Sequence, residues 1–318
     1  MLVLGIESTA HTLGAGVCRN GEVLSNAHDI YKPKKEGIVP RKAADHHAEV
    51  FSEVLSSSLS SAGVSMEELD LVAFSQGPGI GAPLAVGCTA AKYLSLKYSK
   101  PLIGVNHPYA HVKIAEHLTG VSNPLVLYVS GGNTQILAEE KSGFRIFGET
   151  LDIGLGNLFD TFAREAGMAY AHGSALENLA RGGSYIELPY TVKGTNLSFT
   201  GLQTAAARAL KEHPARDVAY SMMETAFSMC CEALERALFL TRKKGIIACG
   251  GVAQNRRLQS MLRILAKEDG VEFGVAPDEY NRDNGAMIAY AGDLLYTKKG
   301  TKPPEAWSPA PNQRIDSA

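Results

Sequence analysis

The sequence lacks any apolar run near the roughly 20 residues that a membrane-spanning helix needs, and its first residues lack the basic and apolar leader of a secretory signal peptide. We therefore expect a cytoplasmic protein with no membrane contact. Cysteine is also scarce. The five cysteines include no C-x-x-C pair, which indicates neither a disulfide framework nor a zinc finger. Buried structural thiols are the expected alternative.

An excess of positive charge is missing as well. The formal net charge of −2 excludes a protein that coats nucleic acid with a uniformly basic surface, so any RNA contact has to be local. The best local candidate is a loop interrupted by proline and glycine, whose cations are Lys32, Lys34, Lys35, Arg41 and Lys42. A solvated surface loop without a partner remains an equal alternative.

The length of 318 residues and the hydrophobic content of 45% fit two ordinary globular domains. The chain opens on a predicted meander of three strands at residues 2–6, 13–19 and 22–30, with a hairpin signal at Asn20-Gly21. A second meander is expected at residues 125–129, 135–140 and 144–153. An ungapped offset of 123 residues superimposes the two, so the chain looks internally duplicated.

Each meander is followed by helical periodicity and by further strands. Helices are expected at residues 44–62, 82–98, 157–166, 174–181, 218–243, 258–267 and 285–296, and strands at 69–75, 101–105 and 245–249. A duplicated βββαβα unit predicts an α/β fold of the actin-like or Hsp70-like kind, the ASKHA or ribonuclease H-like class. Such a fold has two lobes with nucleotide and metal in the cleft between them.

The expected lobes are residues 1–122 and 123–302, with part of the closing helices free to pack back onto the first lobe. Residues 303–318 are rich in proline and carry no helical or strand period, so we expect an extended linker or an ordered strap.

Two histidines carry the first chemical signal. His107 and His111 follow a predicted strand and lie four residues apart, so a helix places both on one face, where two imidazoles can chelate one metal ion. A purely structural role for the pair stays open at this point. A metalloprotease of the H-E-x-x-H type is disfavoured, because Pro108 stands where that motif has its general base.

Glycine turns after buried strands carry the second signal. Tyr128 to Thr134 form a turn with paired glycines and hydroxyl groups that suits a phosphate or carboxylate, and residues 249–255 form a turn that suits a purine. Asp160 and Glu177 are candidate acceptors for ribose hydroxyls. Gly173 would let the chain pass the sugar. Asp283 precedes a helix, and without a partner it is by default a helix cap.

Taken together, these motifs resemble the TsaD/OSGEP family, the tRNA threonylcarbamoyladenosine transferases formerly described as O-sialoglycoprotein endopeptidases. The resemblance covers Met1 to about Lys302, and residues 37–47 look like the archaeal and eukaryotic branch. The motifs that carry it are GIEST at residues 5–9, NHPYAH at 106–111, VSGGNT at 129–134, GGVAQN at 250–255 and RDNGAM at 282–287.

The resemblance implies a set of site residues. One metal ion, iron in preference to zinc, would be held by His107, His111, Tyr128 and Asp283. The phosphate and acyl part of an adenylate would lie on Tyr128, Val129, Ser130, Gly131 and Gly132. Its ribose and adenine would lie on Asp160, Gly173, Glu177 and Asn255.

The resemblance also implies the reaction. The threonylcarbamoyl group of threonylcarbamoyl-adenylate would pass to the exocyclic amine of the adenosine 3′ to the anticodon in ANN-decoding tRNAs. The chain would act as the catalytic subunit of KEOPS, with partners that include a small atypical kinase, in some relatives fused at the C-terminal end.

Two other functions remain as alternatives. A small-molecule kinase of the actin-like fold would share the purine turn, although Mg²⁺ is usually held by carboxylates and water rather than by two histidines. A nucleotide-gated scaffold would bind nucleotide without turnover. Release of phosphate from ATP with a small acceptor would favour the kinase.

Overall fold

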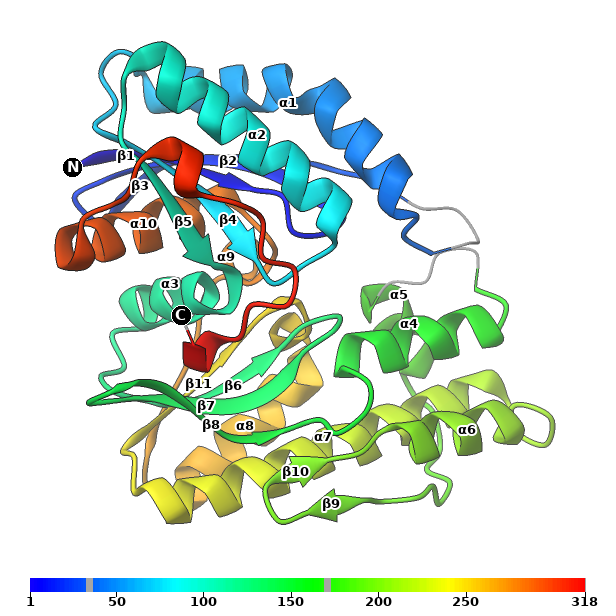
Figure 1. The fold of residues 1–318 in the computed structure, drawn as a ribbon. Helices are drawn as coiled ribbons and strands as arrows, with labels where there is room; N and C mark the ends of the chain where they lie inside the picture. Colours follow the sequence, from blue (N-terminus) through cyan, green and yellow to red (C-terminus); the bar gives the residue numbers. More distant parts are fainter. Residues whose placement is uncertain (33–36, 169–172, 318) are drawn as a thin grey trace. The chain divides into compact units, whose positions relative to one another are not determined.

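The computed structural model describes residues 1–32, 37–168 and 173–317 and shows an α/β protein with two five-stranded sheets (Figure 1). The chain divides into two compact units. Met1–Ile114 and Arg282–Ala318 form the first, and Ala115–Asn281 form the second. The first unit is made of two separate segments of the chain, whereas the expected lobes, residues 1–122 and 123–302, are each one continuous segment. The difference arises because the last long helix, α10 (Gly285–Lys299), packs on the first sheet.

The sheet of the first unit has the strand order β3-β2-β1-β4-β5. Its strands are β1 (Leu2–Glu7), β2 (Thr12–Arg19), β3 (Glu22–Ile30), β4 (Leu71–Gly77) and β5 (Leu102–Asn106). The first three are antiparallel, and β4 and β5 run parallel to β1. Because successive side chains of a strand face opposite sides, Leu4 and Ile6 join the core under α1 (Pro40–Ala62) and α2 (Gly81–Tyr98), whereas Gly5 faces α10.

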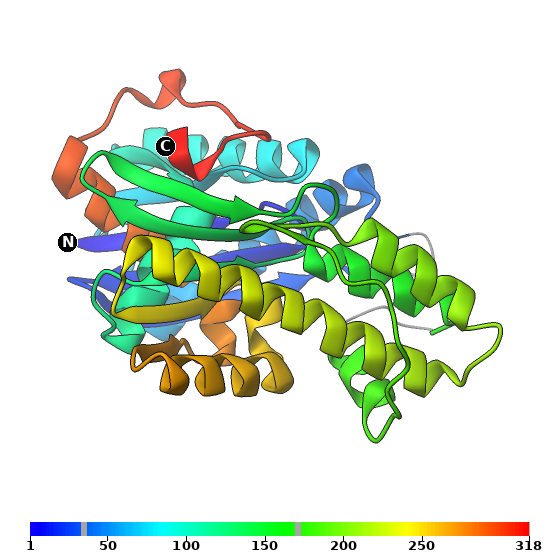
Figure 2. The ribbon, with the colours of Figure 1, turned by 90° about the horizontal axis from the view of Figure 1, so that it is seen from below.

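The sheet of the second unit repeats this order as β8-β7-β6-β11-β12. Its strands are β6 (Leu125–Val129), β7 (Thr134–Glu140), β8 (Gly143–Glu149), β11 (Gly245–Cys249) and β12 (Glu272–Val275). Its helices are α4 (Leu155–Glu165), α5 (Gly173–Ala180), α6 (Thr200–Ala209), α7 (Ala215–Thr241), α8 (Arg256–Glu268) and α9 (Asp278–Asn281), and α7 runs alongside the sheet (Figure 2). The matching strand orders confirm the duplication that the sequence predicts.

Some elements differ from the sequence expectation. The strand expected at residues 144–153 ends at Glu149, and α6, β12 and the small hairpin β9 (Val192–Lys193) with β10 (Asn196–Leu197) had not been expected. The hairpin strands have two residues each and β12 has four, which is too short for a clear period of alternation.

The carboxylate of Asp152 explains why β8 stops early. Its Oδ1 accepts hydrogen bonds from the backbone N–H groups of Ile153 (2.7 Å) and Phe199 (2.9 Å), and its Oδ2 accepts from Thr200 N–H (3.0 Å) and the Ser198 hydroxyl (2.7 Å). Residues 150–153 therefore form a turn that anchors the start of α6. Burial alone would raise the pKa of Asp152, but these donors hold it well below its ordinary value.

Asp152→Ala is expected to destabilise the protein by about 1 kcal/mol at neutral pH, the usual cost of a lost helix cap. Because the folded-state pKa is depressed, this contribution is complete above the unfolded-state pKa and declines as pH falls below about 4. The difference between the variant and the parent in urea unfolding should therefore be constant above about pH 5 and shrink steadily as pH falls below about 4 toward the depressed folded-state pKa. Asp45→Ala, which removes an exposed carboxylate on α1, is the control; a difference for Asp152→Ala that stays constant over the whole pH range would contradict the assignment.

The segment after α10 is an ordered strap on the first unit. Trp307 packs edge-on against Phe74 with ring centroids 6.2 Å apart, and the Ala310 N–H donates to the Gln76 carbonyl at 2.7 Å. A Cβ at Gly104 would lie 2.7 Å from the Trp307 ring, so that glycine lets the indole reach the sheet. Of the two expectations for residues 303–318, linker or strap, the strap describes this segment.

The five cysteines are free thiols, and all but the half-buried Cys231 are buried. Burial raises the pKa of Cys18 and Cys231 to about 12, which keeps both protonated and unreactive at neutral pH. The expectation of buried structural thiols is confirmed. Among the described residues, no helix combines the length and the hydropathy that a membrane span requires.

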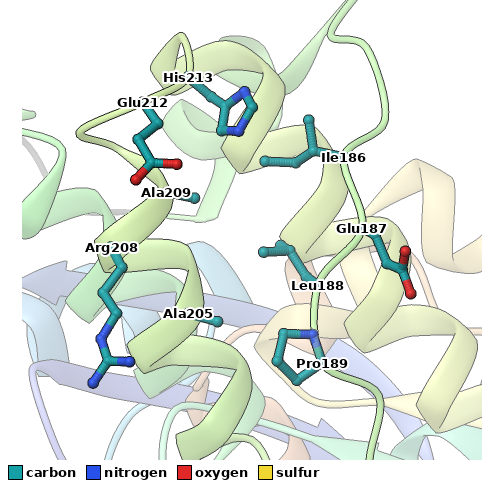
Figure 3. A pocket seen from close by; sticks show the side chains of 9 residues that line it. All are labelled: Ile186, Glu187, Leu188, Pro189, Ala205, Arg208, Ala209, Glu212 and His213. Carbon is teal, nitrogen blue, oxygen red and sulfur yellow. The ribbon is translucent and has the colours of Figure 1, made fainter.

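An open groove of about 550 Å³ lies on the second unit between α6 and an extended segment (Figure 3). Its lining residues are Ile186, Glu187, Leu188, Pro189, Ala205, Arg208, Ala209, Glu212 and His213. None of the site residues expected from the sequence lines this groove, so the candidate chemistry lies elsewhere.

Candidate metal centre

His107 and His111 project from the first two turns of α3 (His107–Thr119), which begins directly where β5 ends. The Asn106 side-chain oxygen accepts a hydrogen bond from the Tyr109 N–H at 3.0 Å and so caps the helix. The two imidazole rings are buried, with centroids 4.6 Å apart and planes at 87°. The predicted placement of both histidines on one helix face is what the structure shows.

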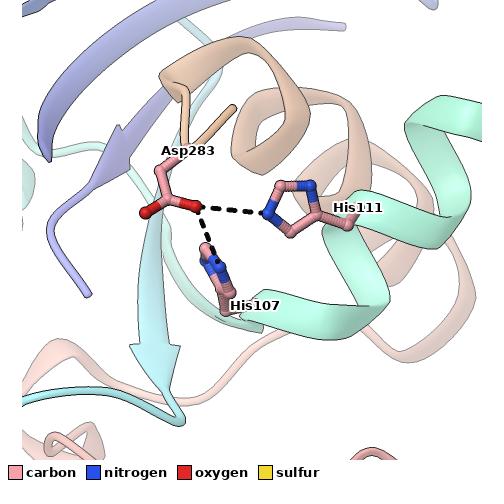
Figure 4. A group of neighbouring side chains, drawn as sticks. All are labelled: His107, His111 and Asp283. Atoms are coloured by element: carbon pink, nitrogen blue, oxygen red, sulfur yellow. Dashed lines mark hydrogen bonds and ion pairs between the residues drawn. The ribbon is translucent and has the colours of Figure 1, made fainter. Parts of the chain in front are cut away.

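Asp283 completes a cluster of three potential ligands (Figure 4). Its Oδ1 lies 3.4 Å from the Nε2 of His107 and 3.4 Å from the Nε2 of His111. Among residues 1–32, 37–168 and 173–317, this is the one group of three or more histidine, cysteine or acidic side chains whose ligand atoms lie within 4.8 Å of one another.

The helix that follows Asp283 places it there. Helix α10 approaches the first sheet through glycine: a Cβ added at Gly16 would lie 2.3 Å from the Ala286 backbone nitrogen, and one at Gly285 would lie 2.2 Å from the Gly16 nitrogen. The N-cap of α10 is Asn284, whose side chain accepts from the Met287 N–H at 2.9 Å. The capping role that served as the default for Asp283 thus belongs to its neighbour.

Burial and neighbouring charges have opposite effects on the pKa values of this cluster. Burial alone would lower the pKa of His107, but Glu7 and Asp283 raise it to about 10. The pKa of His111 is lowered by burial and by the nearby His107, with Asp283 acting in the opposite sense. Burial would raise the pKa of Asp283, yet the hydrogen bonds from both histidines hold it well below its ordinary value. A carboxylate between two imidazoles therefore favours positive charge at the centre.

The spacing of the three atoms fits a transition-metal ion. Ligand bonds of about 2.0–2.1 Å in a tetrahedral arrangement separate neighbouring ligand atoms by roughly 3.3 Å. The two Nε2 to Oδ1 distances of 3.4 Å match that separation. Two imidazoles and one carboxylate also form a donor set that zinc and iron both accept, whereas Mg²⁺ prefers oxygen ligands.

The remaining residues of the predicted ligand and acyl site lie in the second unit. Tyr128 is buried near the end of β6, directly before the turn of Val129, Ser130, Gly131 and Gly132. The Asn157 N–H donates to the Gly131 carbonyl at 2.9 Å, so this turn packs on the start of α4. Gly154 is required there, since a Cβ would lie 2.4 Å from the Gly131 oxygen.

The predicted nucleotide residues also lie within the second unit. Asp160 is half-buried on α4, and Gly173 and Glu177 lie on the neighbouring α5. Gly250 adopts φ 93° before the 3-10 helix η1 (Gly251–Gln254), which contacts α4. The Asn255 oxygen accepts from two N–H groups at the start of α8, a capping role that sequence reasoning had missed.

The predicted tRNA loop is only partly described. Lys32, Arg41 and Lys42 are exposed, and Arg41 pairs with Asp45 at 2.9 Å. Lys34 and Lys35 lie outside the described residues.

Sequence reasoning also missed the partner of His107. The His107 Nδ1 lies 3.0 Å from the carboxylate of Glu7. Glu7 is the last residue of β1 and is fully buried. The signal for this contact is present in the sequence, because LVLGIE closes an apolar strand on a single acidic residue. A lone carboxylate at the buried end of a strand needs a partner.

Comparison with known proteins gives one family. Residues 21–290 match the model of TsaD, described as tRNA N6-adenosine threonylcarbamoyltransferase. A protein of that name from Thermococcus kodakarensis is 52% identical over 299 residues, which cover 93% of this chain and 92% of the relative. A relative from Methanothermobacter thermautotrophicus, named a probable bifunctional tRNA threonylcarbamoyladenosine biosynthesis protein, is 48% identical; 94% of this chain matches 57% of it.

Solved structures support the fold. The crystal structure of HypF from T. kodakarensis aligns with a TM-score of 0.67 at 15% identity, covering 93% of this chain and about half, 48%, of that protein. The activator of the 2-hydroxyisocaproyl-CoA dehydratase from Clostridium difficile aligns with a TM-score of 0.51 at 13% identity and covers 95% of this chain. With the two matching sheets, these likenesses confirm the predicted actin-like fold class.

Proposed function

Because the chain belongs to the TsaD family of tRNA N6-adenosine threonylcarbamoyltransferases, we propose that it transfers a threonylcarbamoyl group to an adenosine of tRNA. The donor is threonylcarbamoyl-adenylate, and the acceptor is the exocyclic amine of the adenosine 3′ to the anticodon in ANN-decoding tRNAs. The cluster of His107, His111 and Asp283 carries this proposal, because a metal ion held there would act as a Lewis acid in an acyl transfer that uses no protein nucleophile.

The substrate residues are assigned by family resemblance. Tyr128 lies near the end of β6, Gly173 and Asn255 lie at the starts of α5 and α8, and Asp160 and Glu177 lie within α4 and α5. Tyr128 is the proposed fourth metal ligand. The turn of residues 129–132 is proposed to hold the phosphate and acyl group, where glycine leaves backbone N–H groups accessible. Ribose and adenine are proposed to contact Asp160, Gly173, Glu177 and Asn255.

The reaction needs few groups from the protein. The adenosine amine attacks the carbamoyl carbon, a C–N bond forms, the bond to the phosphate oxygen breaks, and AMP leaves as the amine loses a proton. A bound iron or zinc ion would supply Lewis-acid chemistry at this centre. The backbone N–H groups of the glycine turn orient the donor and meet the charge that develops on the leaving phosphate. A base in a single-stranded anticodon loop can be extruded at small cost.

The proposal also covers the partners and the location of the enzyme. Its partners are KEOPS subunits, among them a small atypical kinase. The name of the bifunctional relative, in which this chain matches only 57% of the length, supports a second activity encoded in one polypeptide. The proposed location is the cytoplasm, and the exposed Lys32, Arg41 and Lys42 are the proposed contacts to tRNA phosphates.

The deciding experiment combines the purified protein, with and without KEOPS partners, with threonylcarbamoyl-adenylate and unmodified ANN-decoding tRNA. Mass spectrometry of the digested nucleosides should show threonylcarbamoyladenosine. If no product forms with every partner present and metal confirmed, a kinase or a nucleotide-gated scaffold becomes the better explanation. Release of phosphate from ATP with a small acceptor would then identify the kinase.

Glu177→Ala is expected to weaken adenylate binding by about tenfold or more, because a carboxylate that accepts ribose hydroxyls contributes roughly 1.5–3 kcal/mol. The metal content should stay unchanged, since Glu177 is not among the proposed ligands, three of which Figure 4 shows. Isothermal titration and metal analysis measure the two effects separately. Glu165→Ala, an exposed carboxylate on α4, is the control, and an unchanged affinity for Glu177→Ala removes it from the ribose site.

A further inference from the structure

Glu7 is a fully buried carboxylate at the end of β1, beside the proposed metal centre but outside its ligand set. Three donors surround it. The Thr9 N–H lies 2.6 Å away, the Thr9 hydroxyl 2.5 Å away, and the His107 Nδ1 3.0 Å away. Burying a carboxylate is unfavourable even when it is paired, so a strand end that served packing alone would be more stable with an apolar residue.

The two oxygens of Glu7 have separate partners. Oε1 accepts from both donors of Thr9, whereas Oε2 faces the Nδ1 of His107. A backbone N–H can only donate, so the group at the Oε1 position has to be an acceptor. The group at the Oε2 position then decides which ring nitrogen of His107 carries the proton.

We infer that Glu7 is a positioning residue of the metal centre. By accepting the Nδ1 proton of His107, it holds the imidazole with Nε2 directed at Asp283, which leaves the Nε2 lone pair for the ion. Carboxylates that orient ligating histidines in this way fix both the ring and its tautomer. This inference rests on the proposed metal site and names a residue that acts on the metal through His107.

Glu7→Gln tests the inference because it keeps the shape of the side chain and replaces the acceptor that faces the His107 Nδ1 by a donor. The Thr9 N–H retains the amide oxygen at the Oε1 position, which turns the amide NH₂ toward the His107 Nδ1. Two donors then face each other unless His107 carries its proton on Nε2, the atom that would bind the metal. Cobalt(II) affinity, measured by visible absorption, is expected to fall by about 10–100-fold, and the cobalt spectrum should change.

Ser75→Ala is the matched control, because the Thr9 hydroxyl itself lies 3.4 Å from the His107 Nδ1. Ser75→Ala removes a buried hydroxyl of the neighbouring β4 that accepts from the Ser8 N–H at 2.9 Å, and it keeps Glu7, Thr9 and His107. Its cobalt affinity should stay near that of the parent. A folded Glu7→Gln protein with parental affinity and spectrum overturns the inference, and so does an equal loss in Ser75→Ala, because a general packing defect would explain both.

Two further measurements keep the test decisive. If circular dichroism shows that Glu7→Gln does not fold, Glu7→Asp replaces it. The shorter carboxylate weakens the bond to His107, so affinity should still fall, and a parental value overturns the inference. If the parent protein itself binds no cobalt(II) or zinc, the proposed metal centre is wrong, whereas binding in the parent and equally in both Glu7 variants rejects the role of Glu7 alone.

Discussion

Asp283→Ala is expected to abolish stable metal binding and to lower threonylcarbamoyl transfer by a factor on the order of 10³ or more. A catalytic metal contributes several kcal/mol to transition-state stabilisation, and each 1.36 kcal/mol is a factor of ten in rate. Asp283 supplies the one negative charge that lies between the two imidazoles, 3.4 Å from each Nε2. Without it, Glu7 still faces the Nδ1 of His107, but the two Nε2 atoms lose the carboxylate that would bind a divalent ion beside them.

The effect is measured as metal per chain by plasma mass spectrometry and as nucleoside product per unit time. Asp278→Ala is the control, because Asp278 lies five positions earlier and pairs with Arg256 in the second unit. It should keep its metal and its activity. Full metal content in Asp283→Ala, or in the double variant His107→Ala with His111→Ala, would show that the ion lies elsewhere.

Gly16→Val is expected to have the largest effect on stability, about 3 kcal/mol or more. The first carbon of the new side chain would lie 2.3 Å from the nitrogen and 2.6 Å from the Cα of Ala286. Both are backbone atoms of α10, which cannot move aside as a flexible side chain would. The helix has to shift as a unit, and Asp283 shifts with it, so metal affinity should fall together with the melting temperature.

Gly201→Ala is the control for this prediction. Gly201 lies inside α6 and has no other atom within 4 Å of an added Cβ. Alanine there should be neutral or stabilise by about 0.4–1 kcal/mol, because it restricts the unfolded chain. Equal melting temperatures for Gly16→Val and the parent protein would mean that α10 does not pack on β2 as the structure has it.

Two features show how far the sequence alone predicts this protein. The pairing of His107 with His111 follows from helical geometry, because four residues make about one turn, and the structure places both rings on one face. The duplicated meanders follow from hydrophobic alternation and recur as sheets of the same strand order. Asp283 could be assigned only by family resemblance, since no local pattern relates it to a helix 172 residues earlier.

Local periodicity therefore determined most of the helices and strands, and with them the duplication and the paired histidines, because these depend on neighbours within one or two helical turns. It did not predict α6, β12 or the hairpin of β9 and β10. The tertiary structure alone decided that Asp283 reaches both imidazoles and that Glu7 accepts from His107. Each of these contacts depends on α10 approaching β1 and β2 at the distance that glycine permits, or on β1 and β5 ending at the same edge of their sheet. Contacts between residues a hundred or more positions apart depend on how helices and strands pack together. The periodicity of hydrophobic residues within one helix or strand does not predict that packing.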